Sequence, residues 1–452
     1  MTTRRHMVMF GAGAGILAGI SYTLSPLFTI CLPLLIITAV WAGRDLSERQ
    51  RRWFVILVGG GILVRLIVIA LLFVTARFDQ PFATLFGDEE LLKFRSVWIR
   101  NIGLGVPISR ADFIYSYEDV GRSSYLFGLA YLQALVGAVP YGVHMMNATF
   151  YVCGTLIMFR AVRAAFGAIA ALAGMALLLM FPTLFAWSIS ALKEPAYTFL
   201  SILHLLCAVA IVRGDTWTKR LVALIAVIAL TVSLETVRRG GMQAGAAGAI
   251  GGLALGWTWQ LAVARPRFGF AALVTAPVLA LALFAMPSVN QRVLGVVRNV
   301  AVYHVGHIVS PGYSYKILDS RYYHDGRLLW NMGGVEGGAF VVNSLIAFVA
   351  EPVPWRIESR PMLIYLPEQM LWMLVLALVP FGAVAGMRRD PIVTSLLVCC
   401  GLALVIMVGL PSGNIGTLIR HRGLVLTYFA CLAGLGLCEV ARLLMSRARV
   451  AR

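Results

Sequence analysis

The chain has 452 residues, of which 60% are hydrophobic and 13% are charged. An ordinary soluble domain is about half apolar and about a quarter charged. The composition therefore excludes a soluble single-core protein, a disordered chain, a collagen-like chain and a small disulfide-rich domain, and it indicates an all-α, polytopic membrane protein. The net charge of +18 fits basic residues that flank spanning helices on the cytoplasmic side, so nucleic acid is not an expected partner.

Apolar stretches along the chain predict about ten to twelve transmembrane helices, since one span takes about 20 apolar residues. The candidate spans are 7–23, 26–42, 53–75, 143–162, 166–185, 194–212, 220–236, 241–263, 268–287, 365–386, 391–410 and 422–443. The first two are short and meet at Ser25-Pro26, so they are either two helices or one hairpin-like insertion. We interpret the first as an uncleaved span rather than a signal peptide. All seven cysteines lie in apolar stretches, which predicts neither a disulfide framework nor a metal-binding cysteine pattern.

The distribution of basic residues decides how to treat two shorter apolar stretches, 124–139 and 339–350. If neither crosses the membrane and the N-terminus is cytoplasmic, half of the 38 lysines and arginines fall in the short cytoplasmic segments, as the positive-inside rule requires. We therefore expect 124–139 to be a juxtamembrane helix in the outer interface, and the same argument applies less strongly to 339–350. Both termini are then cytoplasmic. The Ala/Gly/Arg-rich composition is typical of a bacterium of high GC content, which predicts a location in the bacterial inner membrane.

This topology divides the chain into five parts. They are N-terminal transmembrane helices at 1–75, a first extracytoplasmic loop at 76–142, a central transmembrane bundle at 143–286, a second extracytoplasmic loop at 287–363 and C-terminal transmembrane helices at 364–452. Loops of this length are uncommon unless they are functional or disordered, and both loops carry aromatic residues and Gly/Pro turn signals. There is no phosphate-binding Gly-Lys-Ser loop, so any chemistry would need a donor that is already activated.

Two acidic motifs lie at the predicted outer face. Asp88 and Glu89 open the first loop, where adjacent carboxylates can bind a divalent cation or supply a general base, because crowding raises the pKa of one of them. Lys193 and Glu194, followed by Pro195, stand at a predicted outer turn and would place a second acid beside the first loop. The alternative interpretation of each motif is a helix start, where acids and proline are both favourable.

Basic residues also gather where the topology predicts the outer face. Guanidinium groups bind phosphate oxygens in pairs, so these positions could hold a lipid-linked phosphate. The candidate phosphate-binding residues, with Lys193, are Arg238, Arg239, Arg321, Arg327, Arg420 and Arg422. The alternatives are side chains that reach ordinary headgroups, or a solvated loop surface. His324 and His421 stand among these arginines, but His421 alone does not support catalysis.

Acids and arginines on one predicted face fit a transfer from a lipid-linked phosphate sugar to a hydroxyl group. The arginines would hold the leaving phosphate, and a carboxylate would deprotonate the acceptor.

The order of these parts resembles the GT-C glycosyltransferases, which include the protein O-mannosyltransferases and the lipid A aminoarabinose transferases. Asp88-Glu89 stands where that superfamily has its Asp-Glu or Asp-Asp motif, 124–139 stands where it has an interfacial helix, and Glu194 lies near a second acid of several families. The closing 416–422, Gly-Thr-Leu-Ile-Arg-His-Arg, is similar to a pattern in bacterial relatives. The chain departs from the pattern in having no large soluble C-terminal domain and in its longer late loop.

The resemblance implies a membrane-embedded transferase of cell-envelope polysaccharide biosynthesis. Its donor would be a polyprenyl-phosphate sugar, its acceptor a hydroxyl of a glycan, lipid or protein, and its reaction inverting. Some relatives need a divalent cation (Mg or Mn), which Asp88 and Glu89 would hold here, and others need no cofactor.

Two other functions remain open. An O-antigen-type polymerase or ligase would act on lipid pyrophosphate-linked glycans through Arg321, His324 or Arg327 of the late loop. A transporter or flippase of lipid-linked saccharides would make no glycosidic bond, although the sequence shows no inverted repeat of the kind common in transporters.

Overall fold

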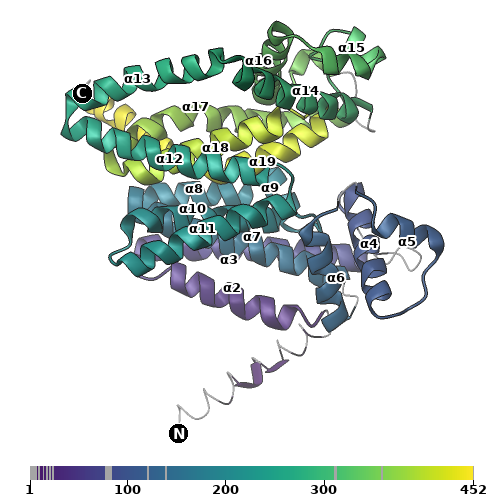
Figure 1. Cartoon of the computed structure of the whole chain (residues 1–452). Helices are drawn as coiled ribbons and strands as arrows, with labels where there is room; N and C mark the ends of the chain where they lie inside the picture. Colours follow the sequence, from purple (N-terminus) through teal and green to yellow (C-terminus); the bar gives the residue numbers. More distant parts are fainter. Residues whose placement is uncertain are drawn as a thin grey trace. The chain divides into compact units, whose positions relative to one another are not determined.

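The computed structural model describes residues 25–76, 84–119, 122–137, 140–309, 313–357 and 360–450, together with a few isolated residues before Ser25. Within these ranges the regular elements are helices (Figure 1), and the one β contact is an isolated bridge between Ser314 and Asn414. The all-α prediction is therefore confirmed. The first predicted span, 7–23, lies largely outside the described residues.

Seven described helices are long and apolar enough to cross a membrane, so the prediction of a multi-pass membrane protein is also confirmed. They are α3 (Glu48–Val74), Gly142–Phe166 of α7 (Pro140–Phe166), α10 (Glu194–Arg213), α11 (Trp217–Val237), Leu363–Arg389 including α17 (Leu366–Arg389), α18 (Pro391–Gly409) and Ile415–Arg447 of α19 (Ile415–Val450). An eighth results if α8 (Ala168–Met180) and α9 (Pro182–Ser188), which are bent by 65°, form one span.

The other predicted spans inside the described ranges are helical as well. The predicted span 26–42 is α2 (Phe28–Ala42), whose 15 residues are short for a crossing. The predicted spans 241–263 and 268–287 are α12 (Gly241–Ala264) and α13 (Pro266–Ala285). The described helices that meet the length and hydropathy requirements thus provide seven or eight of the ten to twelve predicted crossings.

The chain forms two compact units, and each is described by itself. The first unit comprises 1–161, 178–203 and 232–239. It includes α2, α3, α4 (Gly87–Gly103), α5 (Arg110–Ser116) and α6 (Ser124–Val136). The helix predicted at 124–139 is α6, which ends at Gly137 with a positive φ of 82°. It buries Tyr125 and Gln133 and leaves Tyr131 and Leu135 largely exposed.

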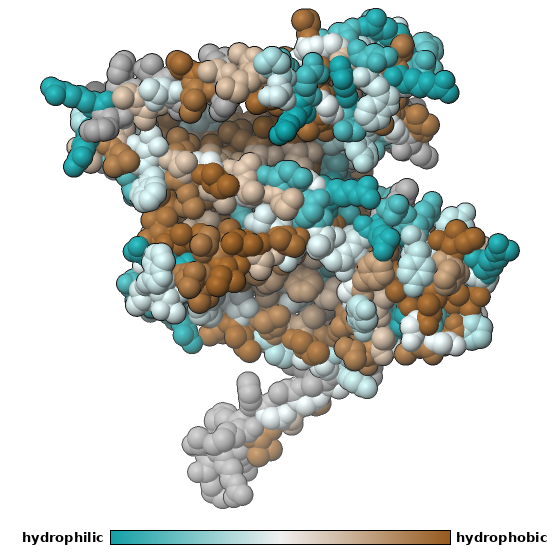
Figure 2. Space-filling model, viewed as in Figure 1, coloured by the Kyte–Doolittle hydropathy of each residue, from teal (hydrophilic) through white to brown (hydrophobic). Residues whose placement is uncertain are grey.

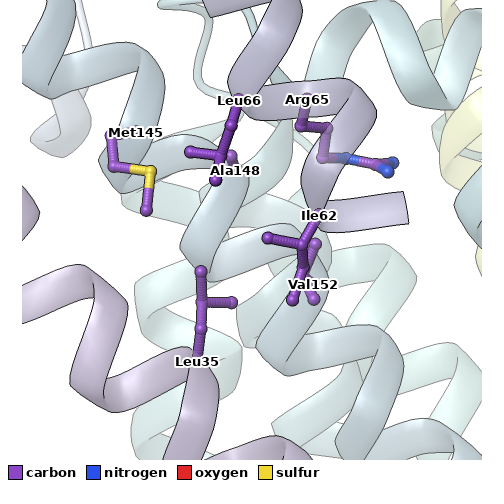
Figure 3. A pocket seen from close by; sticks show the side chains of 7 residues that line it. All are labelled: Leu35, Ile62, Arg65, Leu66, Met145, Ala148 and Val152. Carbon is purple, nitrogen blue, oxygen red and sulfur yellow. The ribbon is translucent and has the colours of Figure 1, made fainter. Parts of the chain in front are cut away.

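An arginine inside α3 stabilises the break between α8 and α9. The chain turns at Phe181, whose extended backbone precedes Pro182 at the start of α9, and proline has no N–H with which to continue the helical hydrogen bonds. The Arg65 guanidinium donates to Leu179 O at 2.9 Å and to Ser188 Oγ at 2.7 Å. Arg65 also borders a small apolar hollow, but its guanidinium points away from the other side chains that line it (Figure 3). A charge at membrane depth is thus satisfied by the backbone carbonyls of Gly61 and Leu179 and by the Ser188 hydroxyl.

The second unit comprises 162–177, 204–231 and 240–452. Its helices α12 and α18 approach so closely that a Cβ atom on Gly252 would lie 2.7 Å from the Cα of Leu396. Small residues allow this kind of close helix contact in membranes. The predicted second loop, 287–363, is mostly helical in this unit. It forms α14 (Pro287–Val309), α15 (Arg321–His324), η1 (Gly326–Asn331), α16 (Gly334–Ala350), η2 (Pro354–Arg356) and part of η3 (Arg360–Tyr365).

The surface follows this division into apolar spans and polar connections. Figure 2 shows apolar side chains over the visible outward faces of the helices, and hydrophilic ones gathered over the region of α14 and α15. In a chain with several membrane spans, apolar outward faces are those that contact lipid.

Candidate functional site

Glu89 is fully buried at the start of α4, although its neighbour Asp88 is exposed. Its Oε1 accepts hydrogen bonds from the main-chain amides of Leu85 and Phe86 at 3.0 and 2.9 Å, and its Oε2 accepts one from Ala191 at 2.8 Å. Burial raises the pKa of Glu89, and the three amides oppose that rise. The carboxylate therefore caps its own helix and also fixes the connection between α9 and α10.

A lysine and a histidine continue this buried cluster. Lys93, one turn after Glu89 on α4, places Nζ 2.8 Å from Nε2 of His144. The other ring nitrogen, Nδ1, lies 2.5 Å from the carbonyl of Ile189, so it carries the proton and Nε2 accepts from the lysine. Burial lowers the pKa of Lys93 to about 8, and nearby Glu89 opposes the shift. The same Nδ1 lies 3.9 Å from Glu89 Oε2.

The connection Ile189–Leu192 is held by side chains at each of its four carbonyl groups. His144 bonds the first, and Asn147, one turn further along α7, donates to Ser190 O and Leu192 O at 2.7 Å each. The Tyr125 hydroxyl donates to Ala191 O at 3.0 Å. Backbone in a membrane protein must find such partners inside the protein, so this network fixes the geometry of the residues that follow.

Those residues are Lys193 and Glu194, at the start of α10. Glu194 is 2% exposed, and its Oε1 lies 3.4 Å from Nη1 of Arg238, just beyond the end of α11. Lys193 and Arg238 are half-buried, and Arg239 is exposed. The structure thus brings Asp88, Glu89, Lys193, Glu194, Arg238 and Arg239 to one region of the first unit.

The exposed carboxylates in this region are those of Asp88 and Glu90. Both of the Glu89 oxygens already accept main-chain hydrogen bonds, which leaves its neighbours as the more accessible groups. Among the described residues, no three His, Cys, Asp or Glu side chains come close enough to hold a metal ion. Magnesium is often bound by one or two carboxylates with substrate phosphates, so cation dependence through Asp88 and Glu89 stays a prediction.

Sequence reasoning missed four members of this cluster, namely Tyr125, Lys93, His144 and Asn147. The signal that was available is the pair His144 and Asn147 inside the predicted span 143–162, since polar groups at membrane depth are costly and therefore serve a purpose. Nothing in the residue spacing indicated that they contact 189–192.

The arginines predicted near the last span lie in the second unit. Arg422 is 3% exposed and donates to Phe348 O at 2.8 Å, to Gln369 Oε1 at 2.6 Å, and to the carbonyls of Val349 and Glu351. These contacts use most of its donors, which favours a positioning role over phosphate binding. Arg420 is half-buried, two residues before it.

His421, between these arginines, is also engaged with the α18–α19 turn. Its Nδ1 lies 2.8 Å from Ser412 Oγ. The carbonyl of Ser412 accepts from His304 Nδ1 at 3.0 Å and from the Tyr315 hydroxyl. Burial lowers the pKa of His304 to about 4, so it is neutral at physiological pH. This second network attaches the late loop to the α18–α19 turn.

The remaining predicted residues of the late loop are exposed. Arg321 forms an ion pair with Glu336, and Tyr322 donates to the same carboxylate at 2.7 Å. Arg327 and His324 lie on the surface of η1 and α15. Arg321 and Arg327 are bonded within the late loop, to Glu336 through the guanidinium group and to Asp325 through the main-chain amide, respectively.

Comparisons with known proteins add no assignment: no protein-family model, no curated protein and no solved structure matches the chain.

Proposed function

We propose that this protein is an integral-membrane glycosyltransferase that moves a sugar from a polyprenyl-phosphate donor to a hydroxyl acceptor, with inversion. The observation that carries the proposal is the exposed carboxylate of Asp88 beside a fully engaged Glu89, in a region that also holds Lys193 and Arg238. An exposed carboxylate in the same region as cationic side chains combines the two requirements of this reaction: a base and a holder for a leaving phosphate.

In this reaction the Asp88 carboxylate takes the proton of the acceptor hydroxyl. The acceptor oxygen attacks the anomeric carbon while the bond between that carbon and the phosphate oxygen breaks. The electron pair stays on the leaving polyprenyl phosphate, whose charge the Lys193 ammonium and the guanidinium groups of Arg238 and Arg239 stabilise. A single displacement inverts the anomeric carbon. A divalent cation bound at Asp88 would add charge stabilisation to the same phosphate.

Glu89 and Glu194 support this site by positioning it. Glu89 holds the amide of Ala191, two residues before Lys193, and Glu194 holds Arg238. A misplacement of catalytic groups by about 1 Å can cost about 100-fold in rate, so both acids are needed even though neither takes the proton.

The test is release of polyprenyl phosphate from a pool of polyprenyl-phosphate sugars extracted from host membranes. The purified protein and its Asp88→Asn variant are compared by mass spectrometry, with Glu90→Gln as the matched control because Glu90 is an exposed carboxylate on the same turn. We expect release by the wild type and by Glu90→Gln, and a loss of at least about 100-fold for Asp88→Asn. Equal release by all three would contradict the base role, and no release by the wild type would contradict the transferase.

We further propose that the reaction takes place on the extracytoplasmic face of the bacterial inner membrane, with both termini cytoplasmic and the surrounding lipids supplying the donor. The support is the asymmetry of basic residues between the two sides of the spans. Reporter fusions after residues 119 and 450 test it: the first should be active outside the cytoplasm and the second inside.

A further inference from the structure

Helix α16 of the second unit exposes a continuous apolar stripe. The outer stripe consists of Val335, Ala339, Val342, Ile346 and Val349. Their spacing of three or four residues places them on one face of the helix. Val342 and Ile346 are 56% and 59% exposed. The opposite face, with Phe340 and Phe348, is buried in the second unit. Both faces of α16 are therefore apolar.

The polar groups of α16 are few and gather toward its beginning. Glu336 accepts a hydrogen bond from the amide of Gly333 and pairs with Arg321. Beyond this first turn the only polar side chains are Asn343 and Ser344. A helix in water carries a polar face, whereas a helix that is apolar all round belongs in a protein core or in lipid. The exposed half of α16 has no protein cover in its unit, and the acyl chains of a bilayer match its apolar character.

The carbonyl groups at the end of α16 are hydrogen-bonded by the protein, as those of a helix that ends inside a membrane must be. Its last carbonyl groups accept hydrogen bonds from side chains of the spans rather than facing solvent. Arg422 bonds Phe348 O, Val349 O and Glu351 O, Gln369 bonds Val349 O and Ala350 O, and Trp372 bonds Val349 O at 3.2 Å. In hydrocarbon each backbone polar group must be satisfied by the protein.

The depth of this helix end follows from the same contacts. Trp372 is the tenth residue of the candidate span Leu363–Arg389, so it lies about 14 Å along that span at 1.5 Å per residue. Arg422 is the eighth residue of the span Ile415–Arg447. After α16, the chain runs through Pro352 and Pro354 to Trp355, which is 81% exposed and suits the level of the headgroups.

We propose that α16 is a membrane-embedded half-span: it enters the hydrocarbon layer from the side that holds Glu336, ends at the level of Arg422, and returns to the same side at Trp355. The part of its outer stripe from Ala339 to Val349 contacts the acyl chains of the bilayer. A 17-residue helix is about 25 Å long, shorter than the hydrocarbon thickness of about 30 Å, so it dips into the membrane without crossing it. The inference is independent of the proposed transferase activity.

The first experiment is cysteine accessibility in lipid nanodiscs, where both membrane faces meet the reagent. Val342→Cys and Ile346→Cys are compared with Ser320→Cys, an exposed polar position before α15, using a membrane-impermeant maleimide. The wild type supplies the baseline, because its cysteines lie in apolar helices. We expect Ser320→Cys to label at least 10-fold faster than either stripe variant, and all three to label fully after denaturation. Equal labelling of the stripe would overturn the proposal.

The second experiment identifies what covers the stripe. A fluorophore attached to Ile346→Cys after detergent solubilisation is returned to nanodiscs that contain either ordinary or dibrominated phosphatidylcholine. Quenching by at least about half in the brominated lipid, and little quenching at Ser320→Cys, supports contact with acyl chains. A protected stripe without quenching would mean that protein covers it, as in a dimer of this chain, and would overturn the lipid contact. Ala339→Cys replaces either stripe position that fails to fold.

Discussion

The carboxylate of Glu89 accepts a hydrogen bond from the amide of Ala191, 102 positions later in the chain, at 2.8 Å. This contact joins the beginning of the first predicted loop to the turn between α9 and α10. It explains how an acid at the start of α4 and an ion pair at the start of α10 come to share one region, although the sequence separates them widely.

Replacement of Glu89 should therefore reduce stability more than replacement of its neighbours. Glu89→Ala leaves the amides of Leu85, Phe86 and Ala191 without their acceptor, and one buried hydrogen bond to a charged group contributes about 1.5–3 kcal/mol. We expect a loss of at least this size in the free energy of unfolding, measured by thermal or denaturant unfolding in detergent. Glu90→Ala, the exposed control, should change it by less than about 0.5 kcal/mol. Equal effects would contradict the anchoring role.

Asn147 should be as important as Glu89 for the connection 189–192. Its amide nitrogen donates to two carbonyls of that connection, so Asn147→Leu leaves both unsatisfied at a cost of about 1–3 kcal/mol each. Thr155→Val is the control, because the buried Thr155 hydroxyl bonds only the backbone of its own helix in the described contacts. We expect Asn147→Leu to lower both stability and transfer activity, and Thr155→Val to lower neither by more than a small factor.

Lys93 should make stability depend on pH in the alkaline range. Burial lowers its pKa from 10.5 to about 8 in the folded state. Between these values the unfolded chain holds a proton that the folded chain has lost, so the free energy of unfolding rises with pH. Wild-type stability, followed by denaturant unfolding from pH 7.5 to 10, should rise relative to Lys93→Met. Lys219→Met, at an exposed lysine paired with Asp215, should keep the wild-type slope. A wild-type slope retained by Lys93→Met would refute this assignment.

The fold class follows from the sequence because hydropathy directly reflects burial in lipid. The helix predicted at 124–139, which is α6 in the structure, was recognisable for the same reason. The distribution of basic residues argued that it does not cross the membrane. The sequence left two interpretations of the motif at Asp88 and Glu89: a general base or cation ligand, or the start of a helix. In the structure Glu89 caps α4, and Asp88 remains exposed beside it.

The contacts of the site could not be predicted, because they join segments that no spacing rule relates. Asn147 lies 43 and 45 positions from the carbonyls that it bonds. The contacts of Arg422 could not be predicted from the sequence either. Its place near the start of the last span was readable, but its direction depends on how α16 and α17 pack, and it turns inward to their carbonyls and Gln369.

Arg422 should be irreplaceable even by lysine. Its planar guanidinium donates to three carbonyls and to Gln369, a geometry that a single ammonium group cannot reproduce. Arg422→Lys and Arg422→Ala should both lower the unfolding temperature in detergent. Arg447→Ala, at an exposed arginine near the other end of α19, should leave it unchanged. Full stability of Arg422→Lys would show that charge alone is sufficient there.

The late-loop arginines distinguish the transferase from an O-antigen-type polymerase or ligase. Arg321 and Arg327 are exposed, and an exposed ion pair such as Arg321–Glu336 contributes little to stability because solvent screens it. If Asp88 is the base, Arg321→Ala and Arg327→Ala should keep release of polyprenyl phosphate within about threefold of wild type, whereas Asp88→Asn abolishes it. The measurement is the same mass-spectrometric assay, with lipid pyrophosphate-linked glycans supplied in parallel. Loss of activity in the arginine variants, together with full activity of Asp88→Asn, would move the chemistry to the late loop and favour the polymerase or ligase.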